Sequence, residues 1–180
     1  MHTRKHNNEV FYAEDRVIRV RSSDVQWLKK QAGGNLRERA RLCTHRNTED
    51  LLHEMFIVLS RDTYIRPHKH LGKPESFHVI EGTVDVVVFD ENGGVNEVIR
   101  MGNYESGMAF YYRILDPLYH TLLIRSNVLV FHETTTGPFK LADTAFAPWS
   151  PEVDDKNACK AFVSALSNKT NTLNHAPELT

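Results

Sequence analysis

The stretch that decides the fold is His68-Lys69-His70-Leu71-Gly72-Lys73-Pro74-Glu75, which is followed seven residues later by Gly82. In an extended strand, side chains two residues apart point to the same face, so His68 and His70 can reach one common point. The glycine and proline that follow predict a turn, which brings Glu75 back beside the two histidines. Two imidazoles and one carboxylate form a ligand set that first-row divalent metals favour. The stretch therefore predicts a strand–turn–strand unit that binds a metal ion.

Short candidate strands separated by turn signals surround this unit. They cover residues 64–70, 76–81, 83–89, 96–101, 108–114, 120–124 and 128–134. Gly, Pro, Asn and Asp dominate the segments between them, as in Asp116-Pro117, which are typical of turns. Short strands without intervening helices predict a mainly β fold of the jelly-roll kind. His120 follows the turn at Pro117 and is the expected fourth ligand, from a later strand of the same barrel.

The barrel core is expected at residues 61–136 of what we predict to be a single domain. A small N-terminal α/β extension occupies residues 1–60, with a strand at 15–20 and a helix after Ser22 or Ser23 that ends at Gly33-Gly34. Residues 137–166 are expected to form an irregular segment that ends in a short helix at 156–166. The polar residues 167–180 predict a disordered tail.

Composition limits the classes of function. The 180 residues carry a formal net charge of −1, so no basic surface is expected to attract nucleic acid or a membrane. Two cysteines do not make a disulfide framework, and the N-terminus lacks the apolar stretch of a signal peptide. We therefore expect a cytoplasmic protein whose partner is a small-molecule ligand.

The spacing of the ligand residues matches a known family motif. Glu75 lies five residues after His70, and Gly82 lies seven residues after Glu75. This pattern resembles the first motif of the cupin superfamily, and the resemblance implies the cupin double-stranded β-helix, a jelly-roll barrel.

The second cupin motif is kept in part. Its histidine corresponds to His120, but Pro117 precedes it by three residues instead of five, and Ile124 replaces the usual asparagine. The two motifs together imply one divalent transition metal (Zn, Fe, Mn or Ni). Its ligands would be His68, His70, Glu75 and His120.

The resemblance continues outside the two motifs. Residues 39–45, 64–68, 73–75, 137–139 and 146–152 are similar to the WbuC-like family of cupin-fold metalloproteins. Members of that family are encoded among genes for bacterial surface-polysaccharide synthesis. The resemblance therefore implies a role in surface-polysaccharide metabolism but does not identify a reaction.

Basic residues alternate along residues 37–45. Arg39, Arg41 and His45 share one face of the expected strand. That face is either solvated or, if the strand crosses the mouth of the barrel, a binding site for an anionic sugar. In the second case Arg39 and Arg41 would bind the substrate, and His45 would move a proton.

Glu133 is a second candidate for proton transfer. A two-residue turn at Ser126-Asn127 would pair His120 with Glu133 and place a carboxylate near the metal, whereas a slip of one residue would bring His132 opposite His120. Among the tyrosines, Tyr64 and Tyr112 are expected on the cavity wall as substrate contacts.

Three histidines and one glutamate leave coordination positions open, unlike a closed structural zinc site. The leading hypothesis is a metal-dependent enzyme of the isomerase or epimerase type, acting on a sugar or nucleotide-sugar. An iron-dependent dioxygenase and a non-catalytic metal- or sugar-binding sensor stay open as alternatives. A homodimer is also expected, because barrels of short strands often cover their edges with a second copy.

Overall fold

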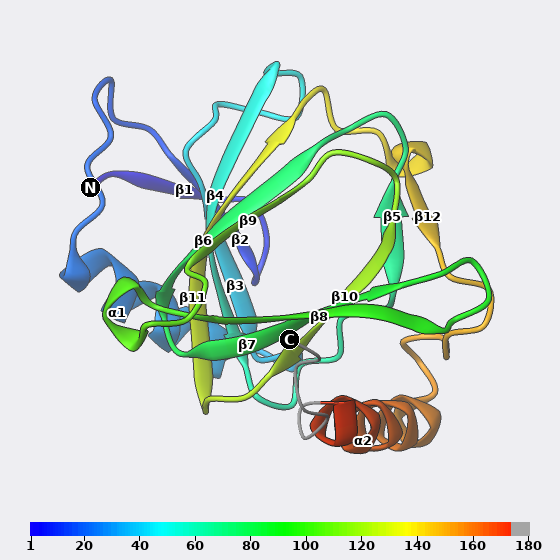
Figure 1. Cartoon of the computed structure of the whole chain (residues 1–180). Coiled ribbons are helices and arrows are strands. Elements are labelled where there is room, and N and C mark those ends of the chain that lie inside the picture. The colour runs from blue at the N-terminus through cyan, green and yellow to red at the C-terminus, as the bar shows by residue number, and fades with distance from the viewer. Residues whose placement is uncertain (174–180) are drawn as a thin grey trace.

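Two β-sheets face each other in the computed structural model, which describes residues 1–173 (Figure 1). The larger sheet has the strand order β1 (Thr3–Lys5), β2 (Val10–Ala13), β3 (Arg39–Cys43), β4 (Leu52–Ser60), β11 (Val128–Thr136), β6 (Glu75–Glu81) and β9 (Tyr111–Ile114). The smaller sheet has the order β12 (Thr144–Phe146), β5 (His68–His70), β10 (Tyr119–Ile124), β7 (Thr83–Phe89) and β8 (Val95–Gly102). From β4 onward, strands that follow one another in sequence lie in opposite sheets, as β10 and β11 do, except for the hairpin of β7 and β8. This arrangement confirms the predicted mainly β jelly roll.

Gly82 marks one passage of the chain from the larger sheet to the smaller one. It lies between β6 and β7 with a φ of 89°, in the region that favours glycine. A Cβ atom at this position would lie 2.3 Å from the carbonyl oxygen of Val128. Only glycine therefore allows the chain to cross so close to the start of β11.

The core lies between the sheets, where alternate residues of each strand meet. On β6, for example, Glu75, Phe77 and Val79 are buried, whereas His78 and Ile80 are exposed. Apolar side chains from both sheets fill most of the barrel, including Leu59, Val86, Met101, Leu129 and Phe131. The polar groups that share this interior concentrate where β5 ends and β6 begins. We call this the open end of the barrel.

Helix α1 (Ser22–Gly33) covers the outer face of β3 and β4, where Leu28 packs against Ala40 and Leu42. The helix begins and ends where the sequence predicts. The strand expected at residues 15–20 is not formed, and strands β1 and β2 precede that segment instead. Val17 is largely exposed, whereas Ile18 and Val20 pack against the cluster beneath helix α1 without pairing to a neighbouring strand. Strands β3 and β4 lie within the expected N-terminal extension, but they are hydrogen-bonded members of the larger sheet.

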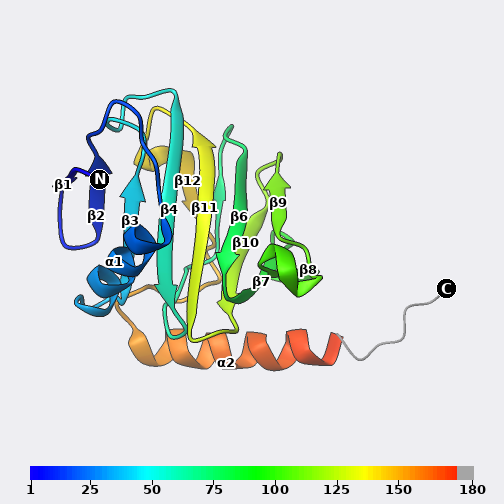
Figure 2. The ribbon, with the colours of Figure 1, turned by 90° about the vertical axis from the view of Figure 1, so that its left-hand side faces the viewer.

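Helix α2 (Lys156–Leu173) runs along the outside of the barrel, as Figure 2 shows. It continues seven residues beyond the end expected at Leu166, so the predicted tail begins too early. The reason is a buried ion pair: Arg125 binds Asp85 at 2.7 Å and also donates to the hydroxyls of Ser167 and Thr170. These contacts give the last turns of the helix partners that a local sequence pattern cannot reveal. Residues 174–180 of the expected tail lie outside the described residues.

Two short 3₁₀ helices, η1 (Tyr104–Ser106) and η2 (Leu141–Asp143), lie in the connections after β8 and β11. Among the described residues, neither α-helix combines the length and the apolar character that crossing a membrane requires.

Candidate metal centre

Four side chains from three strands converge inside the open end of the barrel. His68 on β5 and His120 on β10 are direct cross-strand partners in the smaller sheet. His70 lies two residues further along β5, on the same face as His68. Glu75, the first residue of β6, reaches them from the larger sheet. One donor atom from each of the four lies within 4.8 Å of the others, an arrangement that could hold a metal ion.

Backbone carbonyls orient two of the imidazoles. Nδ1 of His68 lies 2.8 Å from the carbonyl oxygen of Arg66, and Nδ1 of His120 lies 3.0 Å from that of Leu118. A carbonyl oxygen can only accept, so each Nδ1 donates a proton, and Nε2 is the nitrogen that can bind a metal when it is unprotonated. In His120, burial is outweighed by the hydrogen bond and charge of Glu75, which raise the pKa of that ring, so a metal ion would have to displace the Nε2 proton. Metal-binding histidines in proteins are held in this way, with the second ring nitrogen donating to a carbonyl or carboxylate.

Glu75 is the centre of the hydrogen-bond network. Its carboxylate lies 2.8 Å from Nε2 of His70 and 3.4 Å from Nε2 of His120. The hydroxyl of Tyr112 on β9 donates to the same carboxylate at 2.8 Å. Burial by itself would raise the pKa of Glu75, but hydrogen bonds and charge from His120 and His70 hold that pKa well below its ordinary value. The carboxylate therefore stays ionised, as a metal ligand must.

The protonation states of the neighbours agree with this. Burial, together with the charge of His120, lowers the pKa of His68 to about 4, so the imidazole is neutral near pH 7. Burial and the negative charge of Glu75 raise the pKa of the Tyr112 hydroxyl well above its ordinary value, so it remains a donor. Three imidazoles and one carboxylate are a donor set that zinc, iron, manganese and nickel all accept. The residues present therefore fit a divalent transition metal.

Glu133 faces the same interior from the larger sheet. Its cross-strand partners are Met55 on β4 and Phe77 on β6, both of which line the core. Burial and then the charge of Glu75 raise the pKa of Glu133 to about 8. The carboxyl forms no hydrogen bond within residues 1–173 and retains some contact with solvent.

The predicted hairpin, which paired His120 with Glu133, is wrong. β10 pairs with β5 and β7, and β11 pairs with β4 and β6, so neither Glu133 nor His132 is a strand partner of His120. The turn at Ser126-Asn127 instead carries the chain from the smaller sheet to the larger one. Glu133 approaches the candidate site across the barrel, from the facing sheet.

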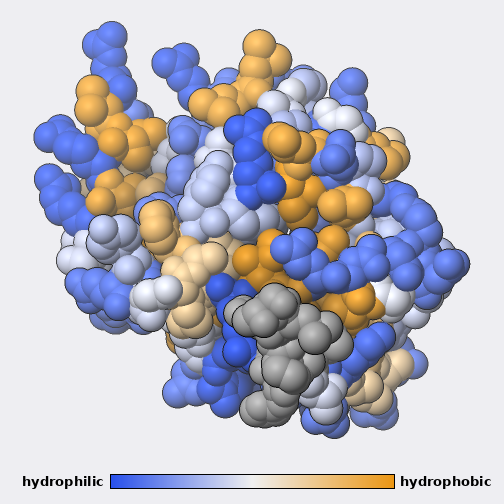
Figure 3. All heavy atoms as spheres, viewed as in Figure 1, coloured by the Kyte–Doolittle hydropathy of each residue, from blue (hydrophilic) through white to orange (hydrophobic). Residues whose placement is uncertain are grey.

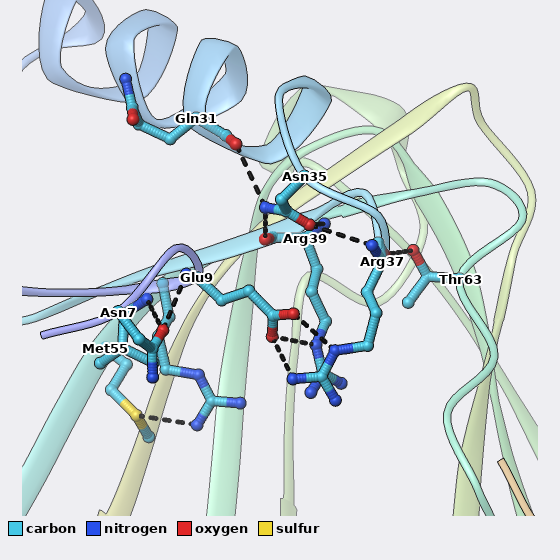
Figure 4. A network of polar contacts seen from close by, with 10 residues as sticks. Asn7, Glu9, Gln31, Asn35, Arg37, Arg39, Met55 and Thr63 are labelled. Carbon is cyan, nitrogen blue, oxygen red and sulfur yellow. Dashed lines mark hydrogen bonds and ion pairs between the residues drawn. The ribbon is translucent and has the colours of Figure 1, made fainter. Parts of the chain in front are cut away.

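The two candidate arginines have different surroundings. Arg41 shares its strand face with Cys43, which belongs to the barrel core, and its guanidinium contacts the sulfur of Met55 at 4.0 Å. No ion pair to Arg41 forms in the part of the chain that the structure describes. Arg39, in contrast, is paired with Glu9 at 2.9 Å, and Glu9 also binds Arg37 (Figure 4). Arg39 is thus already neutralised, whereas Arg41 is available to an anionic ligand.

His45 lies in a different cluster. Its ring stacks on that of His53 with a centroid distance of 4.0 Å, and Tyr12 packs edge-on against it. Nδ1 of His45 contacts the backbone of Glu54. None of these contacts involves a member of the four-residue site, so the role of His45 in proton transfer stays a prediction without structural support.

The tyrosines divide in the same way. Tyr112 lies in the site through its hydrogen bond to Glu75. Tyr64 points to the outside of the barrel, where its hydroxyl donates to the carbonyl of Pro151 at 3.1 Å and its ring packs against Phe162 of α2. The expected role of Tyr64 on the cavity wall is therefore wrong, because the C-terminal segment covers it.

Phe146 is a neighbour of the site that sequence reasoning missed. It lies on β12, directly opposite His68, with a centroid distance of 6.3 Å between the two rings. Cross-strand partners share one face of a sheet, so Phe146 borders the same opening. No local pattern marks residues 144–146 as a strand, because only three residues pair with β5.

A family model described as a domain of unknown function, DUF6016, matches residues 20–101. No curated protein matches the chain. Among solved structures, L-ribose isomerase of Cellulomonas parahominis with L-ribose is 14% identical with a TM-score of 0.50, over 62% of this chain and 70% of that one.

Two further structures are more distant. The cupin domain of Schizosaccharomyces pombe Cnp3 is 12% identical with a TM-score of 0.43, over 55% of this chain and 64% of that one. Oxalate decarboxylase of Lactobacillus farciminis is 13% identical with a TM-score of 0.43, over 54% of this chain. The chain spans about a quarter of that enzyme, since the match covers 27% of it.

The sheet topology, together with the likeness to L-ribose isomerase, confirms the cupin fold. At these identities the likeness shows the fold alone. The relation to the WbuC-like family stays a prediction.

Proposed function

We propose that this protein binds one divalent transition metal and uses it to transform a small polar molecule. The ligands would be His68, His70 and His120 through Nε2, and Glu75 through its carboxylate. The observation that carries the proposal is the convergence of these four donors, two of which have their Nδ1 atoms held by backbone carbonyls. When bound, such a metal polarises a carbonyl or a pair of adjacent hydroxyls on a substrate.

The proposed substrate is a sugar or nucleotide-sugar, and the proposed reaction is of the isomerase or epimerase type. The predicted WbuC-like relation to surface-polysaccharide metabolism supports this choice. Glu133 would accept a proton from a substrate carbon and return it to the neighbouring carbon. Burial and then the charge of Glu75 raise its pKa in the metal-free protein, and a carboxyl in such surroundings can both accept and release a proton.

Arg41 would bind the negative group of an anionic sugar. Its guanidinium faces the interior without an ion-pair partner among residues 1–173, and arginine is suited to bidentate contacts with phosphate or carboxylate. With Arg39 already bound to Glu9, Arg41 is the arginine that we assign to this task.

The experiment measures the exchange of carbon-bound hydrogen of the substrate with solvent, and it does not depend on identifying a product. Metal-loaded protein is incubated in D2O with L-ribose and, separately, with a uridine-diphosphate hexose, and deuterium at carbon is read by NMR. We expect exchange that requires the metal and falls about 100-fold or more in Glu133→Gln, since general acid–base groups contribute roughly 10²–10⁴. Glu105→Gln, an exposed carboxyl on η1, is the matched control and should leave the rate unchanged.

Other outcomes separate the alternatives. Oxygen uptake that depends on substrate and on iron would identify a dioxygenase and contradict the proposal. Ligand-dependent thermal stabilisation without exchange at any metal loading would identify a sensor. We also propose, from the sequence, that the protein is a cytoplasmic homodimer, and light scattering at micromolar concentration tests the dimer.

A further inference from the structure

Exposed apolar side chains collect around the open end of the barrel. Six of them lie in the loops and strand ends next to the candidate metal centre, and all are between 43% and 70% exposed. We call this set the apolar rim: Leu71, Leu115, Leu118, Phe139, Leu141 and Phe146. Soluble proteins seldom leave large apolar side chains grouped in this way unless they bind something.

Hydrogen bonds and an ion pair join two loops of the apolar rim to each other. The amide of Leu71 donates to the carbonyl of Asp143 at 2.7 Å, and Lys73 binds the carboxylate of Asp143 at 2.8 Å and also the carbonyl of Pro138. The loops at residues 71–74 and 137–143 therefore form one border of the opening. Both lie along the upper part of the molecule in Figures 1 and 2.

The loop at residues 115–118 forms the next part of the border. It begins after Ile114, the strand partner of Glu75, and the carbonyl of Leu118 accepts the Nδ1 proton of His120. Leu115 thus follows the strand that pairs with Glu75, and Leu118 precedes the strand that supplies His120. Figure 3 shows exposed apolar surface at the top and in the middle of the face that Figure 1 presents, bordered by hydrophilic side chains.

Phe146 brings the apolar rim to the metal centre itself, because it is the cross-strand partner of His68. Two charged side chains nearby have partners. Arg66 lies over the Phe146 ring and binds Glu152, and Lys69 binds Glu91 at 2.6 Å. Lys140 and Asp116 lie exposed within the loops of the apolar rim and form no ion pair among residues 1–173, so the rim is an apolar border that also carries two free charges.

We infer that the ligand of this site is an amphiphile, with a metal-chelating polar head and an alkyl or aryl group that lies on the apolar rim. The inference rests on the proposed metal site and adds the chemistry of the part of the substrate that stays outside the lumen. We infer an amphiphile because the apolar rim is continuous with the strands that carry the metal ligands. Binding sites for organic molecules combine mostly apolar walls with a few polar groups in the same manner.

A homologous series of metal chelators tests the inference. The full-length protein, loaded with one equivalent of Ni²⁺, is titrated with acetohydroxamate, butyrohydroxamate, hexanohydroxamate and octanohydroxamate. Each fully buried methylene strengthens binding about fourfold, and a half-covered one about twofold. We expect octanohydroxamate to bind roughly 50-fold more tightly than acetohydroxamate, from six half-covered methylenes.

Variants identify where the chain lies. Leu115→Ser with Leu141→Ser, the two most exposed members of the apolar rim, should reduce the dependence on chain length while leaving the affinity for acetohydroxamate and the nickel content unchanged. Tyr104→Ser removes an exposed aromatic side chain outside the apolar rim and should keep the full dependence. Unchanged acetohydroxamate binding also shows that a variant is folded.

Three results would overturn the inference, and they differ in what else they remove. Equal affinity for all four chelators would refute the amphiphile but leave the metal site intact. No metal-dependent binding of acetohydroxamate would remove the proposed function as well. A dimer that dissociates in Leu115→Ser with Leu141→Ser, without any dependence on chain length, would show that a second copy covers the apolar rim.

Discussion

Two clusters of histidine lie at the same end of the barrel, and only one of them is built to bind a metal. Thr135 on β11 has His53 of β4 on one side and Glu75 of β6 on the other, so the clusters are two strands apart. In the first cluster, His53 and His45 stack with their ring planes 4° apart. In the second, the rings of His68, His70 and His120 are inclined to one another by 49° to 77°.

The difference lies in the partners of the rings. Parallel rings direct their lone pairs side by side, whereas inclined rings can direct them to one point. Nε2 of His53 is buried with no hydrogen-bond partner within the described chain, and a Cβ on Gly137 would lie only 2.6 Å from it. The other cluster has Glu75 at its centre and backbone carbonyls behind two rings. A carboxylate and properly held Nδ1 atoms therefore distinguish a metal site from a packed histidine pair.

The largest expected effect separates the two clusters by metal affinity. Glu75→Gln removes the carboxylate and should weaken metal binding by more than about 100-fold, because loss of an outer hydrogen bond alone costs about 10–100-fold. His53→Gln should leave the affinity within about twofold. Competition with a chromogenic chelator measures both. Equal losses would mean that the clusters share one ion.

The next largest effect concerns the hydrogen bond from Tyr112 to Glu75. Tyr112→Phe removes the hydroxyl that donates to the carboxylate and keeps the ring, so metal affinity should fall about 10-fold to 100-fold. Tyr12→Phe is the matched control, because Tyr12 packs against His45 in the other cluster. The same chelator competition applies. An unaffected Tyr112→Phe would show that Glu75 needs no second partner.

The proton on Glu133 gives a pH-dependent effect in the metal-free protein. Its pKa rises from 4.5 to about 8 on folding, so its contribution to stability is complete below pH 4.5 and is lost as the pH rises through 8. Glu133→Gln cannot ionise and should exceed the wild type in free energy of unfolding by about 1–2 kcal/mol at pH 9, after allowance for solvent in the lumen. At pH 4.5 the two should be equal. Urea unfolding at both pH values measures this, and a gain confined to low pH would reverse the assignment.

The smallest effect tests the stacked pair. His53→Phe keeps a ring in place and removes the unpaired Nε2, so the free energy of unfolding should rise by about 1 kcal/mol. His45→Phe removes a ring nitrogen that contacts the backbone of Glu54 and should lower it by about the same amount. Thermal unfolding of both variants gives the comparison. A loss of stability in His53→Phe would indicate that an ordered water or ion satisfies Nε2.

Local sequence was sufficient for the part of the site that lies within one strand–turn–strand unit. The parity of His68 and His70 and the return to Glu75 depend only on strand geometry and on a turn of four residues, and the structure shows the predicted convergence. His120 was predicted from its place after the turn at Pro117 and from the second cupin motif, and its strand does pair directly with β5. Only the convergence of His68, His70 and Glu75 needs no knowledge of the rest of the barrel.

Features that depend on distant partners could not be predicted in this way. The pairing of β11 failed because a jelly roll sends consecutive strands to opposite sheets, which a hairpin count ignores. Arg39 is neutralised by Glu9, which is 30 residues away, and Tyr64 is covered by a segment 87 residues away. Glu133 was singled out for the wrong reason, since it reaches the lumen across the barrel.

Metal analysis combined with X-ray absorption spectroscopy on the purified protein tests the central claim most directly. The account predicts one transition-metal ion per chain, with a first shell of nitrogen and oxygen donors at about 2.0–2.2 Å that includes three imidazoles. The signal should disappear in Glu75→Gln and persist in His53→Gln. A protein that binds no metal stoichiometrically, or an ion that survives Glu75→Gln and is lost in His53→Gln, would contradict it.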